Sequence, residues 1–166
     1  IIDQLGDDAR DAIDGVVEHY YFDKQVLGFE GTTGEVTFIS RDFSTWDEAF
    51  DKELDLYITE WNVRTSTTSE TGLRSASVML EMTSNMSDLG VDAAHVWPVQ
   101  HNTPTDLAGK QQEDVITDAE GRVINTINGA AFDLMSSSLV GLEALDTELS
   151  LEDGSFTFHA WQGEDS

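Results

Sequence analysis

Glu60 is the first candidate for chemistry in this chain, because it stands near the end of an apolar run of strand length, residues 54–62. Thr59, Trp61 and Asn62 flank it. In a β/α barrel, side chains at the C-terminal ends of the strands line the pocket where substrates bind. A carboxylate in that position can attack as a nucleophile or transfer a proton. The sequence therefore predicts a catalytic role for Glu60, and the simpler alternative is a solvated carboxylate at a strand end.

Two further apolar runs, residues 13–22 and 92–102, also end among polar and aromatic side chains. Aromatic rings offer apolar faces to sugars, and imidazole, amide and hydroxyl groups bind sugar hydroxyls. Residues two apart in a strand share a face, so His19 and Tyr21 point the same way, and Tyr21 can donate a hydrogen bond to Glu60. The candidate substrate-binding residues are His19, Tyr21, Asn62, Trp97, Gln100 and His101.

The histidines allow two other interpretations. His19 with Glu60, or His95 with His101, could bind a metal, but neither spacing matches a known site. His19 and His95 could also be hydrogen-bonded histidines of the core. The sequence predicts neither a metal nor a cofactor.

These residues lie in a chain that alternates strands with helices. Strands are predicted over 13–22, 54–62 and 92–100, and helices from Ser44, over 72–89 and over 130–140. Residues 23–43 are predicted as a loop insertion that can include a short hairpin strand at 35–39. From residue 142 the apolar period becomes two, and with a turn at Asp153-Gly154 it predicts a β-hairpin. Three strand–helix units in series favour an α/β fold with a parallel sheet.

The charge of the chain excludes several classes of partner. Eight Lys and Arg residues stand against 33 Asp and Glu residues in 166, a net charge of −25. Such a field repels nucleic acid and anionic membranes, and no apolar run approaches the ~20 residues that span a bilayer. It suits a protein in high salt or one secreted into calcium-containing water, and we expect an extracellular location. The absence of cysteine excludes disulfides and thiolate chemistry.

Several short motifs resemble one enzyme family. Ile58-Thr59-Glu60-Trp61-Asn62 resembles the nucleophile strand of clan A retaining glycoside hydrolases, above all the β-xylosidase and α-L-iduronidase family. Residues 14–21 resemble the sixth strand of such barrels, residues 94–97 the eighth strand, and residues 129–136 the last barrel helix. The resemblance implies that Glu60 is the nucleophile and that Trp97 floors a sugar subsite.

The resemblance also implies a domain organisation. Residues 1–141 would form strands six to eight of a (β/α)8 TIM barrel, and residues 142–166 a β-hairpin of an accessory β-sandwich domain. The acid/base glutamate of the family belongs to the fourth strand, which no segment here supplies. The start at Ile1-Ile2 suggests a processed or truncated product, so we expect the N-terminal half of the barrel, or self-association, to cover the open side. The alternative function is a non-catalytic acidic α/β module, carbohydrate-binding or structural, of a secreted protein.

Overall fold

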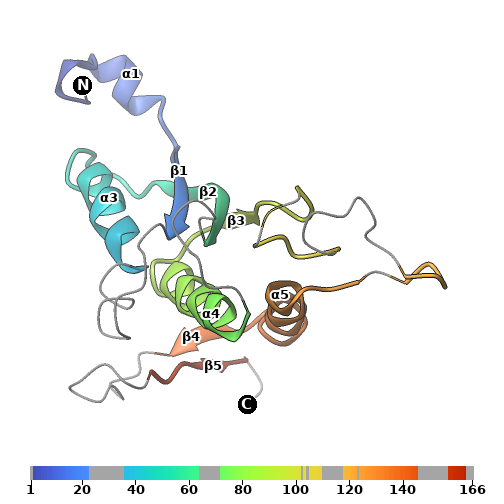
Figure 1. The fold of residues 1–166 in the computed structure, drawn as a ribbon. Helices are drawn as coiled ribbons and strands as arrows, with labels where there is room; N and C mark the ends of the chain where they lie inside the picture. The colour runs from blue at the N-terminus through green and yellow to red at the C-terminus, as the bar shows by residue number, and fades with distance from the viewer. Residues whose placement is uncertain are drawn as a thin grey trace.

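The computed structural model describes residues 2–22, 36–63, 72–101, 103, 105–109, 118–122, 124–145 and 157–163. They form a mixed α/β fold with a three-stranded parallel sheet, helices and a separate pair of strands (Figure 1). In chain order the elements are η1 (Ile2–Gln4), α1 (Asp7–Asp11), β1 (Gly15–Phe22), α3 (Phe38–Asp47), β2 (Asp55–Val63), α4 (Leu73–Asp88), β3 (Ala93–Val96), α5 (Ile127–Ser138), β4 (Glu143–Leu145) and β5 (Ala160–Gln162).

The parallel sheet has the order β1-β2-β3, so each strand pairs with its successor in the sequence. Aromatic and β-branched residues fill β1 and β2, as suits a pleated sheet with one buried face. Paired residues of parallel strands share a face, and Val16, Tyr20 and Phe22 pair with Leu56, Trp61 and Val63. All six of these side chains are buried.

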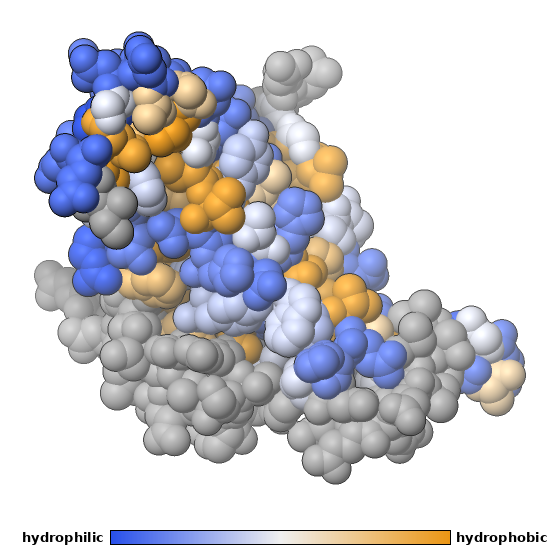
Figure 2. Space-filling model, turned by 90° about the horizontal axis from the view of Figure 1, so that it is seen from above, coloured by the Kyte–Doolittle hydropathy of each residue, from blue (hydrophilic) through white to orange (hydrophobic). Residues whose placement is uncertain are grey.

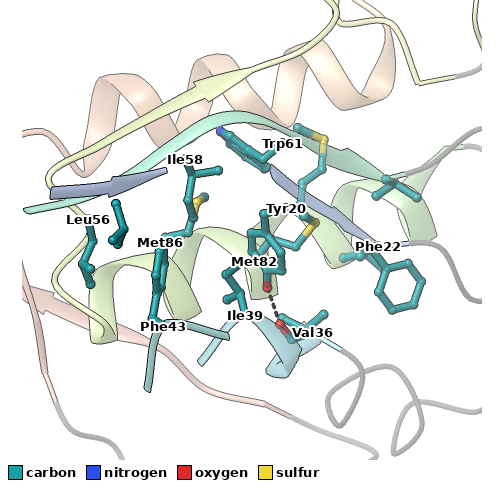
Figure 3. Close-up of a cluster of buried hydrophobic side chains, with 14 of the residues drawn as sticks. Tyr20, Phe22, Val36, Ile39, Phe43, Leu56, Ile58, Trp61, Met82 and Met86 are labelled. Carbon is teal, nitrogen blue, oxygen red and sulfur yellow. Dashed lines mark hydrogen bonds between the residues drawn. The ribbon is translucent and has the colours of Figure 1, made fainter. Parts of the chain in front are cut away.

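The helices that follow the three strands pack on that buried face (Figure 3). Ile39 and Phe43 of α3 and Met82 of α4 belong to the same core cluster as Tyr20 and Trp61. The ring of Phe132 in α5 lies 6.1 Å from the ring of Trp61. The strands therefore follow one another across the sheet in sequence order, and α3, α4 and α5 cover the same face. On the opposite face, Val17 is 57% exposed.

Most of the predicted elements are confirmed. The predicted strands at 13–22 and 54–62 correspond to β1 and β2, and the helix at 72–89 to α4. The helix predicted over 130–140 begins three residues earlier, after Thr126, whose hydroxyl accepts a hydrogen bond from the Gly129 N–H. The predicted strand at 92–100 is shorter, because Pro98 has no N–H with which to extend the ladder.

Two predictions around residue 40 are wrong. Ser44 does not begin a helix; it lies near the end of α3, and its hydroxyl donates to the Arg41 carbonyl. Of the expected hairpin strand, Phe38 and Ile39 are the first residues of α3, and Thr37 is its N-cap. The buried pair Ile39 and Phe43, one helical turn apart, explains the helix.

Near the C-terminus, β4 and β5 pair antiparallel, with Ala144 opposite Trp161. Figure 1 shows this pair beside α4. The predicted turn at Asp153-Gly154 lies outside the described residues. None of the helices described here has the length and apolar character to cross a membrane.

Candidate functional site

The site is built around the Glu60 carboxylate near the C-terminal end of β2. The Tyr21 hydroxyl donates a hydrogen bond of 2.9 Å to its Oε2 atom. Nδ1 of His19 lies 3.7 Å from the same oxygen. The strand register explains the arrangement, because His19 pairs with Glu60 and Tyr21 follows two residues later on the same face of β1.

A β-bulge directs Glu60 to this face. Ile58 pairs with Glu18, but the next residue of β1, His19, pairs with Glu60, so Thr59 is an extra residue in β2. Without it, strict alternation from Ile58 would turn Glu60 into the helix layer and Trp61 out of it. Bulges are frequent next to active sites, where they re-aim a side chain.

The Glu60 carboxylate is accessible to a ligand. Its side chain is 41% exposed, and that of His19 is 57% exposed. A polar contact with this much exposure contributes little to stability because water screens it. The contact between His19 and Glu60 therefore adds little to the stability of the sheet.

Trp97 and His101 follow β3 and lie toward the same edge of the sheet. The Trp97 N–H donates to the carbonyl of Trp61, the residue after Glu60, at 3.1 Å. The Trp97 ring is 5.2 Å from the His101 ring, and Trp97 is 43% exposed. Gln100, in the same segment, is half-buried. An accessible aromatic face thus stands near the polar cluster.

Asn62 has a structural task instead of the predicted contact with substrate. Its side chain is 1% exposed, and its Nδ2 donates to the carbonyls of Trp97 at 3.0 Å and Thr105 at 3.2 Å. Both amide protons are therefore used, and no sugar hydroxyl can reach them. The amide instead fixes the segment that carries Trp97.

Sequence reasoning missed one residue of this edge. The buried Asp106 accepts from the N–H groups of His101 at 2.7 Å and Thr103 at 3.1 Å, and so shapes the loop that presents His101. The only sequence signal for Asp106 is its position in a polar stretch after the third strand. His95 is exposed, so the interpretation of His95 as a core histidine is wrong, and the pairing of Ala94 with Ile58 on the helix side places His95 on the Glu60 face.

The three parallel strands bring one carboxylate to this edge. Glu18 points to the helix side, where it accepts from Trp46 Nε1 at 3.2 Å. Asp55 starts β2 at the opposite end and accepts from the Tyr57 hydroxyl, and this hydrogen bond raises the pKa of Tyr57. Among the described residues, no group of His, Cys, Asp and Glu side chains has the geometry of a metal site.

A cavity of about 270 Å³ lies on the other side of the sheet, between β2, β3, α4 and α5. Trp61, Met86, Phe132 and Leu139 are among the side chains that line it. Because Trp61 faces the helices and Glu60 does not, this cavity is separate from the Glu60 cluster.

In comparisons with known proteins, no family model matches the chain and no curated protein matches it either.

Proposed function

We propose that this chain carries the nucleophile of a retaining glycoside hydrolase. The observation that supports this most directly is the Tyr21–Glu60 hydrogen bond near the C-terminal edge of a parallel sheet. The phenol holds the carboxylate in one orientation and leaves its other oxygen, Oε1, free of Tyr21. An oriented, accessible carboxylate is what attack on an anomeric carbon requires.

The fold is compatible with a segment of a TIM barrel. In a barrel, every helix lies outside the sheet, and the inner face carries side chains toward the axis. Here α3, α4 and α5 all pack on one face, while Val17, His19 and Glu60 lie on the other. Under this proposal, polypeptide outside these 166 residues supplies the other five of eight β/α units and covers the open face.

The proposed mechanism assigns one role to each group. Glu60 attacks the anomeric carbon, the bond to the leaving oxygen breaks, and that oxygen takes a proton from a second carboxylic acid. Water, deprotonated by the same group, then releases the sugar from Glu60. Two carboxyl groups about 5–5.5 Å apart are needed for this chemistry. Among the described residues, β1, β2 and β3 bring only Glu60 to the edge, and Asp106 is buried and bonded to the His101 and Thr103 N–H groups, so this proposal assigns the second carboxyl group to the additional units.

The side chains around Glu60 would bind the substrate. Trp97 offers its exposed ring to the apolar face of a pyranose, and His101 beside it offers an imidazole to a hydroxyl. His19 stands next to the point of attack. Gln100, a further candidate from the sequence, lies on the same segment as Trp97 and is half-buried.

The test is the Glu60→Gln variant of the protein that contains the whole barrel, assayed on a panel of activated aryl glycosides. We expect kcat to fall by about a thousandfold or more, because the amide cannot form the glycosyl-enzyme intermediate. Glu18→Gln is the matched control, since it changes the same charge on the helix side of the sheet. A 2-fluoro glycoside with a good leaving group should label Glu60 in the parent protein. Normal turnover by the Glu60→Gln protein would exclude this role.

The second candidate function, sugar binding without hydrolysis, has its own support in the exposed Trp97 and adjacent His101. It predicts that both the parent and the Glu60→Gln protein are inactive on every glycoside, while Trp97→Ala abolishes binding to a polysaccharide column. Activity of the parent protein would exclude it.

A further inference from the structure

A second polar cluster lies far from Glu60 in the sequence, between α4 and the segment that leads into β5. The imidazole of His159 bridges two α4 side chains. Its Nδ1 is 2.7 Å from Ser84 Oγ, and its Nε2 is 3.1 Å from Glu81 Oε2. The Thr157 hydroxyl donates to the other carboxylate oxygen of Glu81.

In both segments, the side chains that form these hydrogen bonds are close together in the sequence and face the other segment. Residues 81 and 84 are one helical turn apart and share a face of α4. Thr157 and His159 are two apart in the segment that leads into β5, and both side chains contact α4. Every hydrogen bond of the cluster crosses between the two segments.

The cluster is shielded from water. Ser84 is 3% exposed, and the side chains of Glu81 and His159 are 11% and 19% exposed. A buried carboxylate is costly unless it is paired and hydrogen-bonded. Glu81 therefore needs Thr157 and His159 close by, and their departure would leave it without these partners.

We propose that Glu81, Ser84, Thr157 and His159 form a polar latch that docks the C-terminal strand pair onto α4. Polar contacts carry much of this attachment, because Leu145 of β4 and Phe158, between the two latch residues, are 42% and 45% exposed, while Trp161 of β5 is half-buried with its ring 6.0 Å from the His159 ring. The opposite side of α4 holds the sheet through Met79 and Met82. The latch thus fixes residues 157–163 to the helix that follows the Glu60 strand.

The same atoms could suggest a Ser-His-Glu nucleophilic triad, but burial argues against one. A nucleophilic serine must admit a substrate carbonyl beside its Oγ, with hydrogen-bond donors for the oxyanion. Ser84 is almost fully buried, and its hydroxyl lies between α4 and the docked segment. The cluster therefore has the side chains of a Ser-His-Glu triad, but a substrate cannot reach the Ser84 hydroxyl.

The test measures amide hydrogen exchange in the parent protein and in the variants His159→Ala and Ser84→Ala. We expect exchange in residues 157–163 to accelerate about 10- to 100-fold in His159→Ala, and less in Ser84→Ala, while β1 and β2 keep their rates. Ser77→Ala is the matched control, because Ser77 is an exposed serine of the same helix that bonds only within its own turn.

Three other results would overturn the proposal. Unchanged exchange at residues 157–163 in His159→Ala would mean that the cluster does not hold the segment. Faster exchange spread evenly over β1, β2 and α4 would assign these residues to general stability. Rapid labelling of Ser84 by an organophosphorus fluoride, abolished in His159→Ala, would identify a nucleophilic site instead.

Discussion

At the scale of single residues, the sequence predicted the cluster around Glu60 but not the reason for it. The two-residue period of β1 correctly puts His19 and Tyr21 on one side, and Tyr21 bonds to Glu60 as expected. The same period applied to β2 from Ile58 would bury Glu60. The extra residue, Thr59, reverses that outcome, and a bulge has no sequence signature of its own here.

The role of Asn62 could not be predicted for a different reason. Its hydrogen-bond acceptors, the carbonyls of Trp97 and Thr105, lie 35 and 43 residues further along the chain. A local pattern contains no information about which loop returns to cover a strand end. Polar residues at strand ends are thus ambiguous between ligand contacts and loop anchors.

Tyr21→Phe tests the orientation of Glu60. We expect the variant of the barrel protein to lose about 10- to 100-fold in kcat/KM, since one hydrogen bond to a charged group is removed. Tyr57→Phe is the control, because it deletes a hydroxyl bound to Asp55 at the opposite end of β2. Equal activity of the two variants on an aryl glycoside would show that the Tyr21 hydroxyl does not assist Glu60.

At the scale of elements, long periodic segments were predicted best. The helix at 72–89 places Met79, Met82 and Met86 on one face, and only a helix does this over such a length. By contrast, the residues that lead into α3 alternate apolar and polar groups over a short stretch, which also suits a strand. The segment is a helix because Ile39 and Phe43 pack into the core. This is a tertiary contact, which the local sequence pattern does not reveal.

The start of α5 depends on a close backbone contact at Gly129. A Cβ atom built there would lie 1.7 Å from the Leu107 carbonyl oxygen, so a side chain cannot fit without movement. Alanine normally stabilises a helix relative to glycine by about 1 kcal/mol. At this position we expect Gly129→Ala to destabilise the protein instead, by about 1–3 kcal/mol, in urea unfolding. The exposed Ala130→Gly gives the ordinary helix effect for comparison, and a more stable Gly129→Ala protein would contradict the contact.

The turn at residues 118–122 provides a pH-dependent test. The Arg122 backbone N–H, which donates to Asp118, is the largest cause of a pKa for Asp118 below its ordinary value of 3.8, and the guanidinium adds to it. Because the pKa is lowered on folding, the carboxylate stabilises the turn fully above the ordinary value of 3.8, and this contribution is lost as pH falls through the lowered pKa. In Arg122→Gln we expect the pKa of Asp118 to rise but to stay below 3.8, because the backbone donor remains. NMR titration of the Asp118 carboxyl carbon measures this, and a full return to 3.8 would assign the effect to the side chain.

At the scale of the whole molecule, the most distinctive property is the large negative charge. A net charge of −25 on 166 residues makes repulsion between carboxylates a term that opposes folding. In Figure 2, apolar side chains (orange) lie between hydrophilic ones (blue) on one face, so the hydrophilic surface is not continuous. This composition was readable directly from the sequence. The parallel α/β sheet was also predicted, since its strands and helices alternate in simple order.

Salt should therefore stabilise this protein. The screening length falls from about 10 Å at 0.1 M to about 3 Å at 1 M, so neighbouring carboxylates repel one another less. We expect the melting temperature to rise by several degrees between 0.1 and 1 M NaCl, measured by circular dichroism. Sucrose at equal osmolality controls for effects other than screening. A melting temperature that is flat or falls with NaCl would mean that the acidic residues are spaced too widely to interact.

The position of Trp97 makes it an intrinsic fluorescent probe of the sheet edge that carries Glu60. Trp61 is buried at 3% exposure, whereas Trp97 is 43% exposed near the edge that carries Glu60. The chain has four tryptophans, and Trp46 and Trp161 are half-buried, so the emission ranges from Trp61 toward the blue to the exposed Trp97 toward the red. A neutral quencher such as acrylamide reaches Trp97 first, while iodide is held off by the negative field. A ligand that covers the Trp97 ring changes the red part of the emission spectrum, so fluorescence can report binding at this edge.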